Sequence, residues 1–331
     1  MKAIVYTKYG PPEVVSLKEV EIPLPKEGEV LIKVHATTVN RTDCGFRSAE
    51  YFISRFFSGL FRPKLPILGN EFAGKIAAIG KGVSNFAVGQ KVFGFNSSTF
   101  GAHAEYMCMP ANGALATMPP GLSFEEAAPI CEGGHYALNA IRAAKVSSGQ
   151  NILINGATGA IGSAAVQLVK HFGARVTAVC HENHMALVRS LGADHVIDYT
   201  KDDFTKLEEN FDFVFDAVGK SSFSQCKNLL HTKGIYISTE LGKYSSNIFL
   251  ALTTPMFGGK KVLFPIPKIG RQDVEYFREL VESASFRPVV DRKYPLEQIL
   301  AAYQYVETGQ KTGNVVITLP QENHIPQCHD Y

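Results

Sequence analysis

Three glycines lie three residues apart in the segment Asn151–Lys170, which reads NILINGATGAIGSAAVQLVK. An apolar run typical of a strand enters the turn at Gly156, and a run of small residues typical of a helix leaves it after Gly162. Gly156 permits a tight turn, Gly159 lets the backbone approach a pyrophosphate, and Gly162 lets the helix lie close to the strand. The N–H groups at a helix start attract phosphates. The pattern therefore predicts a dinucleotide-binding turn, with contacts from Gly156, Ala157, Thr158, Gly159, Ala160, Ile161 and Gly162.

The next apolar run, RVTAVC, ends at Cys180, about twenty residues after the last glycine. An acidic residue there favours NAD(H) because it bonds the adenosine ribose, and a nearby arginine favours NADP(H). In this chain Glu182 is able to take the ribose, whereas His181 and Asn183 are able to bond a 2′-phosphate. The sequence leaves NAD(H) and NADP(H) open, with NADP(H) slightly favoured, and adds Cys180, His181 and Asn183 to the predicted cofactor contacts.

The first 122 residues read as short strands. Between Gly28 and Asn40, apolar residues alternate with others at the period of a strand that has one buried face. Shorter apolar segments follow near 74–79, 88–95 and 105–109, separated by glycine, proline and asparagine. This spacing is typical of a partly closed antiparallel β domain.

From Ser123 onward the pattern changes, because Ser123 and Glu126 form a capping box that begins a helix. Strand runs then alternate with helical segments to about residue 265; the strands read NILIN, RVTAVC, HVIDY, FDFVFDAV and GIYIST. Such alternation predicts a parallel sheet covered on both faces.

The expected fold class is therefore α/β, with a dinucleotide-binding domain at 123–284 and a β domain at 1–122 that is completed by about 285–331. The last strand, NVVITL, resembles the early β segments and is expected to return to the first domain. We expect the polar tail from Gln321 to be disordered.

The composition excludes several classes of protein. Thirty-three basic and 31 acidic residues leave a net charge of +2 with no basic run, so no nucleic-acid partner is expected. The six cysteines are scattered without a C-x-x-C pair, so neither a disulfide framework nor a zinc pair is expected. No apolar run has the length of a signal peptide or a membrane span. We expect no membrane association and a reduced, cytoplasmic protein.

Taken together, the motifs resemble those of the medium-chain dehydrogenase/reductase superfamily, specifically its zinc-free quinone oxidoreductase (zeta-crystallin-like) branch. The resemblance extends from Met1 to about Leu319. Besides the glycine turn it rests on Val39-Asn40-Arg-Thr-Asp43, Leu68-Gly-Asn-Glu71-Phe-Ala-Gly74, Gly101-Ala-His-Ala-Glu105-Tyr106, Leu191-Gly-Ala-Asp194, Asp216-Ala-Val-Gly219 and Gly313-Asn-Val-Val316. It implies a GroES-like, partly open β-barrel domain built from both chain ends and a Rossmann domain with a doubly wound parallel sheet. The further cofactor contacts expected on this basis are Asn40, Ala217, Val218, Gly219, Ser238, Thr239 and Asn314.

The resemblance also indicates what is missing. Zinc alcohol dehydrogenases of this superfamily hold zinc with a cysteine and a histidine at the positions of Asn40 and Asn70, and an amide is a poor zinc ligand. The lobe of four closely spaced cysteines is missing too, since only Cys108 lies in that region. We therefore expect no metal site.

Without a Lewis acid, alcohol oxidation is difficult, and reduction of a quinone or an α,β-unsaturated carbonyl by NAD(P)H is favoured. Asn40 is the first candidate donor to the developing oxyanion, with an ordinary strand-end amide as the alternative. Tyr136 and Tyr51 are further catalytic candidates, and simple packing of Tyr136 on its helix is the alternative there.

Several questions stay open at this point. The aromatic segment Phe46–Phe61 is either a lid over a planar substrate or a surface packed in the domain seam or on a partner chain. The strand Val262–Phe264 suggests a homodimer, because relatives pair subunits at that edge. The alternative functions are a zinc-free alcohol or carbonyl oxidoreductase of another specificity and a non-enzymatic, crystallin-like NAD(P)H-binding protein.

Overall fold

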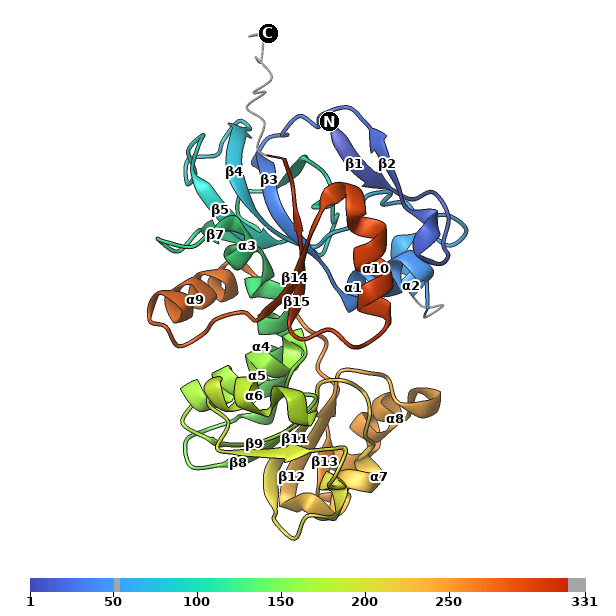
Figure 1. The fold of residues 1–331 in the computed structure, drawn as a ribbon, viewed down its shortest axis with the longest axis vertical. Helices are drawn as coiled ribbons and strands as arrows, with labels where there is room; N and C mark the ends of the chain where they lie inside the picture. The colour runs from blue at the N-terminus through green and yellow to red at the C-terminus, as the bar shows by residue number, and fades with distance from the viewer. Residues whose placement is uncertain (51–53, 321–331) are drawn as a thin grey trace. The chain divides into compact units, whose positions relative to one another are not determined.

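The computed structural model describes residues 1–50 and 54–320 of the chain and divides them into two compact units. Unit 1 comprises the described residues of Met1–Cys131, Ile269–Glu282 and Val290–Tyr331, and unit 2 comprises Glu132–Lys268 and Ser283–Val289. The predicted α/β class and both predicted architectures are confirmed (Figure 1). In the part of the chain described, no helix is both long and apolar enough to cross a membrane.

Unit 1 is a mainly antiparallel β structure. Its elements are β1 (Lys2–Val5), η1 (Pro12–Val14), β2 (Ser16–Glu19), β3 (Glu29–Val39), α1 (Arg41–Ser48), α2 (Ser54–Ser58), β4 (Glu71–Ile79), β5 (Lys91–Phe95), β6 (Tyr106–Pro110), β7 (Leu115–Thr117), α3 (Phe124–Ala127), η2 (Ala128–Ile130), α9 (Arg271–Glu282), β14 (Val290–Pro295), η8 (Leu296–Gln298), α10 (Ile299–Glu307) and β15 (Asn314–Thr318).

Seven strands of unit 1 form one sheet in the order β14-β15-β3-β4-β5-β7, with β6 also paired to β3. The last strand returns as predicted, because β15 pairs antiparallel with β3. The pairing of β14 with β15 is parallel, which the antiparallel prediction did not include. The long strand β3 is almost wholly buried, and Val30, Ile32 and Val34 lie in the core of the unit. The end of β3 is therefore a rigid platform for the residues that follow it.

Unit 2 is a six-stranded, all-parallel sheet in the order β10-β9-β8-β11-β12-β13. Its elements are α4 (Cys131–Ala144), β8 (Asn151–Asn155), α5 (Ala160–His171), β9 (Arg175–Cys180), η3 (Glu182–His184), α6 (Met185–Ser190), β10 (His195–Asp198), η4 (Phe204–Lys206), β11 (Phe211–Asp216), α7 (Phe223–Cys226), η5 (Lys227–Leu229), β12 (Leu230–Ser238), η6 (Lys243–Ser245), α8 (Ser246–Thr253), η7 (Thr254–Phe257) and β13 (Lys261–Val262).

Helices cover the two halves of this sheet separately. α5 and α6 pack on β8, β9 and β10, whereas α7 packs on β12 and α8 on β13 (Figure 1). The strand order reverses between β8 and β11, which is the position where open parallel sheets bind ligands.

The limits of the units differ from the predicted domain limits at three places. The helices α3 and α9 belong to unit 1, because α3 packs on β3 and β4 and α9 packs on β7. The segment Ser283–Val289 belongs to unit 2, where the Arg287 N–H donates to Gln167 Oε1 at 2.9 Å and Gln167 Nε2 donates to the Arg287 carbonyl at 3.0 Å. Sequence periodicity could not show these contacts, because their partners are distant along the chain.

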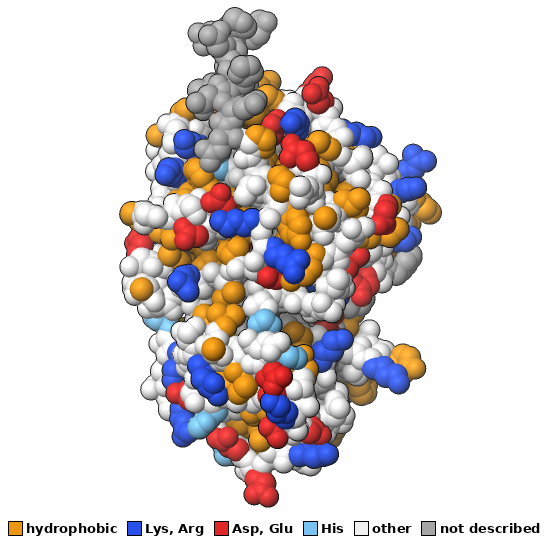
Figure 2. Space-filling model, viewed as in Figure 1, with side chains coloured by type: hydrophobic (Ala, Val, Ile, Leu, Met, Phe, Trp, Pro, Cys, Tyr) orange, Lys and Arg blue, Asp and Glu red, His pale blue; other side chains and the backbone are white. Residues whose placement is uncertain are grey.

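Figure 2 shows basic and acidic side chains mixed over the visible face, in keeping with the net charge of +2. Among the described residues, no disulfide joins Cys44, Cys108, Cys131, Cys180 or Cys226. The predicted tail from Gln321 lies outside the described residues.

Candidate functional site

The predicted glycine turn joins β8 to α5. Gly156 has a φ of 81°, which a side chain disfavours, and a Cβ on Gly162 would lie 2.1 Å from the Gly156 carbonyl oxygen. A Cβ on Gly159, in contrast, would have no neighbour closer than 3.8 Å. Gly159 is also the N-cap of α5, and no side chain caps this helix. Gly156 and Gly162 are therefore required by the fold, whereas Gly159 leaves open space before the first N–H groups of a helix.

The second set of predicted residues follows β9. Cys180 is buried at the end of this strand, and burial raises the pKa of its thiol to about 11, so it is a packing residue and not a reactive one. His181 begins the next turn, where its Nδ1 accepts a hydrogen bond from the Asn183 N–H at 3.2 Å. The structure thus places His181 and Asn183 together.

A lysine that the sequence reasoning missed lies beside them. Cys180 of β9 is the register partner of Asp198 of β10, so the loops after both strands leave the sheet at the same edge. Lys201 Nζ lies 2.5 Å from Glu182 Oε2 and 3.6 Å from Asp198 Oδ2, and the ring of Tyr199 lies 5.9 Å from that of His181. Register pairing of two parallel strands was the signal that could have identified Lys201.

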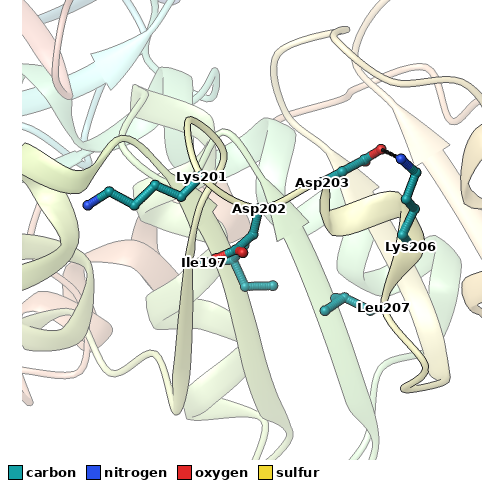
Figure 3. Close-up of a pocket in the computed structure, with 6 residues that line it drawn as sticks. All are labelled: Ile197, Lys201, Asp202, Asp203, Lys206 and Leu207. Carbon is teal, nitrogen blue, oxygen red and sulfur yellow. Dashed lines mark ion pairs between the residues drawn. The ribbon is translucent and has the colours of Figure 1, made fainter.

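An open cavity of about 520 Å³ lies beyond this loop (Figure 3). It is lined by Ile197, Lys201, Asp202, Asp203, Lys206 and Leu207. Asp203 and Lys206 form an ion pair at 3.4 Å, and Lys201 points away from them toward Glu182. None of these six residues is among the predicted site residues.

The remaining residues predicted in unit 2 lie after β11 and β12. Ala217, Val218 and Gly219 form the loop after β11, and Gly219 has a φ of 65°. Ser238 ends β12, where its Oγ accepts from the Glu240 N–H at 3.3 Å, and the Thr239 N–H donates to the Asp216 carbonyl at 3.0 Å. All of these residues lie at the carboxyl ends of parallel strands, where such sheets bind ligands.

In unit 1, Asn40 directly follows β3 and is the N-cap of α1. Its side-chain oxygen accepts from the Asp43 N–H at 3.0 Å, and its own N–H donates to Asp43 Oδ2 at 3.2 Å. Its Nδ2 donates to Asn70 Oδ1 at 2.8 Å and makes a long contact of 3.5 Å with Thr38 Oγ1. Asn40 is buried. The amide is therefore held in one orientation, with one N–H in a short bond and the other in a long one.

Asp43 ties two loops together beneath this amide. Its carboxyl group is fully buried and accepts from the Asn40 and Gly69 N–H groups, so it links the end of β3 to the loop that carries Asn70. Burial raises the pKa of Asp43 to about 7, although these two hydrogen bonds oppose the shift. His103 lies 3.9 Å away, and its Nε2 bonds the Thr38 carbonyl at 2.7 Å. Burial lowers the pKa of His103 to about 4, so the imidazole is neutral near pH 7.

The residues at the expected metal positions do not fit zinc. Asn40 and Asn70 bond each other through their amides, and amides are poor zinc ligands beside thiolate or imidazole. Within residues 1–50 and 54–320, no group of three or more His, Cys, Asp or Glu is arranged to hold a metal ion.

The other predicted residues are distributed over both units. Tyr136 is half-buried on α4, with its ring 4.5 Å from that of His135. Asn314 is buried at the start of β15 in unit 1. Tyr51 lies outside the described residues. Of the aromatic segment Phe46–Phe61, Phe46 packs on Phe100 with ring centroids 4.9 Å apart, whereas the side chains of Phe56 and Phe61 are exposed.

Comparison with known protein families gives two matches. Residues 26–120 match the family described as alcohol dehydrogenase GroES-like domain, and residues 191–317 match the family described as zinc-binding dehydrogenase. The second match contains neither Asn40 nor Asn70, so it says nothing about ligands at those positions.

Whole-chain relatives agree with these matches. The chain is 34% identical to a 2-methylene-furan-3-one reductase of Solanum lycopersicum, over 96% of this chain and 79% of the relative. It is 32% identical to an NADPH-dependent alkenal/one oxidoreductase, chloroplastic, of Arabidopsis thaliana, with the same two coverages. Among solved structures, the quinone oxidoreductase of Coxiella burnetii superposes with a TM-score of 0.87 at 27% identity, over 97% of this chain and 99% of that one.

The comparisons correct one prediction. The sequence led us to expect a cytoplasmic protein, and this was wrong, because several plant relatives that match 96% of the chain are named for the chloroplast or its envelope, which points to a plastid. The prediction rested on scattered cysteines and the lack of long apolar runs. Those features distinguish a reducing, aqueous compartment from a secretory route, but they do not distinguish one reducing compartment from another.

The predicted family is confirmed by a relative that is more than 30% identical over nearly the whole chain and by a superposition that includes both units. The chain belongs to the medium-chain dehydrogenase/reductase superfamily, in its quinone oxidoreductase branch.

Proposed function

We propose that this chain is an NAD(P)H-dependent oxidoreductase that transfers hydride to a quinone or an α,β-unsaturated carbonyl without using zinc. The observation that carries the proposal is the bond between the Asn40 and Asn70 amides at the two positions where zinc members of the superfamily place metal ligands. An amide cannot lower the pKa of an alcohol as zinc does, but its N–H groups can stabilise a developing oxyanion. Relatives named for reduction of quinones, alkenals and enones support this choice.

Each unit contributes one part of the reaction. We assign dinucleotide binding to unit 2, through the glycine turn and the loops at its sheet edge, and the substrate-polarising group to unit 1. A nicotinamide held there would supply the hydride. Asn40 orients the substrate oxygen through its second N–H, which makes only the 3.5 Å contact with Thr38 Oγ1. Thr38 is itself oriented, because its Oγ1 donates to Glu71 Oε1 at 2.6 Å. Tyr136, Tyr51 and Asn314 remain proposed contacts of substrate or cofactor.

We further propose that NADP(H) is the preferred cofactor. His181, Asn183 and Lys201 gather at the edge where the adenosine ribose binds in folds of this type. In the structure Lys201 forms an ion pair with Glu182. A bound 2′-phosphate would take the place of the Glu182 carboxylate as the partner of Lys201, because it carries more negative charge and accepts stronger hydrogen bonds. A relative named as NADPH-dependent supports this preference.

The test is a steady-state assay of the purified protein with NADPH and with NADH, using small quinones, enones and saturated aldehydes as acceptors. We expect oxidation of NADPH with quinones or enones, weaker activity with NADH, and rates that a strong chelator leaves unchanged. Activity abolished by chelation and restored by zinc would contradict the metal-free mechanism. Activity only with saturated aldehydes would favour a carbonyl oxidoreductase, and cofactor binding with no turnover would favour a binding-only protein.

We also propose that the chain forms a homodimer through the outer edge of β13. Among residues 1–50 and 54–320, this short strand pairs with β12 alone. The neighbouring α8 and η7 expose Phe249, Leu252, Met256 and Phe257, with exposed fractions of 66–83%. Apolar side chains concentrated on one short segment are typical of a protein interface. A second copy would cover them and pair with the strand edge at the same time.

A further inference from the structure

Two polar residues close the point where the order of the parallel strands reverses. Asn155 is the last residue of β8, Asp216 is the last residue of β11, and the two are register partners in the sheet. Asn155 Nδ2 donates to Asp216 Oδ1 at 3.2 Å, and both side chains are buried. The pair therefore lies directly beneath the crevice that a dinucleotide enters in folds of this type.

The side-chain carboxylate of Asp216 accepts several hydrogen bonds at once. Most of them come from the loop after β11, including three of its backbone N–H groups. The donors are the Val218 N–H at 3.3 Å, the Lys220 N–H at 3.3 Å, the Ser221 N–H at 2.8 Å, the Ser221 hydroxyl at 2.9 Å and the Tyr236 hydroxyl at 3.4 Å. With Asn155, these donors use both oxygens of a side chain that has no exposed surface. The conformation of residues 217–221 thus depends on one buried carboxylate.

The same loop contacts the glycine turn. A Cβ built on Gly156 would lie 2.3 Å from Val218 Cγ1, so the turn and the loop touch with no room for a methyl group. The Ala217 N–H donates to the Asn155 carbonyl at 3.0 Å, directly before the turn. A displacement of the loop would therefore move Val218, whose side chain packs directly against Gly156 in the turn.

We propose that Asp216 is a positioning residue for dinucleotide binding, whose carboxylate holds residues 217–221 against the glycine turn and so sets the affinity for the cofactor and not the rate of hydride transfer. This inference rests on the proposed function, namely that the cofactor binds at Gly156–Gly162. Asp216 does not itself reach a ligand, because its oxygens are occupied by the six donors described above.

The test variant is Asp216→Asn, which keeps the shape of the side chain but replaces one acceptor oxygen with an NH₂ group that faces other donors. We expect the Kd for NADPH, measured by fluorescence titration, to rise about tenfold or more, because charge-assisted hydrogen bonds are lost. The KM for the cofactor should rise with it, while kcat at saturating cofactor stays within about twofold of the wild type.

A matched control lies on the same strand. Asp212 is at the other end of β11, is half-buried, and accepts from the Asn151 N–H at 2.9 Å. Asp212→Asn removes the same charge and keeps one oxygen that can accept from the Asn151 N–H, and we expect it to leave the Kd for NADPH within about twofold of the wild type. Thermal unfolding of both variants measures any general loss of stability.

Two outcomes would overturn the inference: an unchanged Kd in Asp216→Asn, or equal losses of affinity in Asp216→Asn and Asp212→Asn. If Asp216→Asn does not fold, Ser221→Ala takes its place, since it removes one donor hydroxyl from a half-buried side chain. We expect a rise in Kd of about two- to threefold there, and an unchanged Kd would again overturn the inference. A wild-type protein that binds neither NADPH nor NADH would instead contradict the proposed function.

Discussion

At the scale of single residues, the side-chain amide of Asn40 has two structural roles in the candidate site of unit 1. Asn40 caps α1 through its oxygen and bonds Asn70 through its nitrogen. The capping task follows from the sequence, since Asn40 and Asp43 have the spacing of a capping box. The bond to Asn70 does not, because the partner is 30 residues away and reaches Asn40 only when β3 and β4 are paired. A test of Asn40 must therefore separate catalysis from helix capping.

Two substitutions achieve this separation. Asn40→Ala removes both tasks, whereas Asn40→Ser keeps an N-cap acceptor and removes the amide N–H groups. We expect kcat to fall about tenfold or more in both variants, with the Kd for NADPH nearly unchanged, because one oxyanion donor is lost. Both variants lose the bond to Asn70, so the capping contribution is their difference: Asn40→Ala should lose about 1 kcal/mol more of unfolding free energy than Asn40→Ser. Normal turnover in Asn40→Ser would remove Asn40 from the mechanism.

Buried histidines give unit 1 a defined response to acid. Burial, followed by the charges of Lys75, Lys33 and Lys91, lowers the pKa of His35 to about 4, against a smaller opposing effect of Glu125. Its ring stacks on Phe124 at 4.2 Å, and neither ring nitrogen has a hydrogen-bond partner among the described residues. The unfolded chain takes up a proton near pH 6.5 and the folded chain only near pH 4, so His35 reduces stability as the pH falls through this window.

His35→Phe keeps the stacked ring and removes the titrating group. We expect this variant to be more stable than the wild type by about 1–2 kcal/mol at pH 5 and by less at pH 8, measured by denaturant unfolding at both values. Two other buried groups affect the pH dependence of the unfolding free energy equally in the wild type and in His35→Phe. Burial lowers the pKa of His103 to about 4, so His103 also reduces stability as the pH falls. Burial raises the pKa of Asp43 to about 7, so Asp43 reduces stability as the pH rises toward that value. An equal pH dependence in the two proteins would contradict this account of His35.

At the scale of elements, periodicity and capping predicted most helices and strands, and the contacts that join them were less predictable. The strand–turn–helix of β8 and α5 was predicted because its glycines report local geometry. The parallel pairing of β14 with β15 and the placement of α9 in unit 1 were not, because both depend on surfaces that meet only in the folded chain. The Asp216 network was missed for the same reason, since its Asn155 partner is 61 residues away.

Gly162 and Gly159 have different roles in the turn, and a methyl group at each position meets different surroundings. Gly162→Ala places a methyl group 2.1 Å from the Gly156 carbonyl oxygen, so we expect a loss of at least about 2 kcal/mol of unfolding free energy. Gly159→Ala meets nothing closer than 3.8 Å, so its cost should stay at or below about 1 kcal/mol, the value of a poorer N-cap.

Gly159→Ala should nevertheless raise the Kd for NADPH about tenfold or more, because its methyl group occupies the space through which the pyrophosphate approaches the backbone. Fluorescence titration and thermal unfolding of the same preparations separate the two effects. A Gly159→Ala protein that is stable and binds NADPH normally would show that the turn is structural only.

At the scale of the whole molecule, sequence reasoning was limited to properties that the folded chain itself encodes. The family and both architectures could be identified from the chain, because spaced glycines and strand patterns determine them. The compartment could not, since folding and chemistry are alike in any reducing, aqueous compartment. Assembly can be predicted in part, because an interface requires apolar side chains that are exposed on the isolated chain.

The exposed apolar side chains of segment 249–257 lead to a last prediction, that this segment holds two copies of the chain together. Light scattering should give the wild type a mass of about 72 kDa, twice the 36.2 kDa of one chain, at micromolar concentration. Leu252→Lys places a charge on a side chain that is 71% exposed in the isolated chain, and we expect it to shift the mass toward 36 kDa. Leu24→Lys is the matched control, because Leu24 is 76% exposed and belongs to unit 1, whereas β13 belongs to unit 2, and it should leave the mass unchanged. Because Leu252 is exposed, monomeric Leu252→Lys should unfold like the wild type at concentrations where the wild type has also dissociated. A wild-type mass near 36 kDa, or a dimer that Leu252→Lys leaves intact, would show that this surface does not hold two copies together.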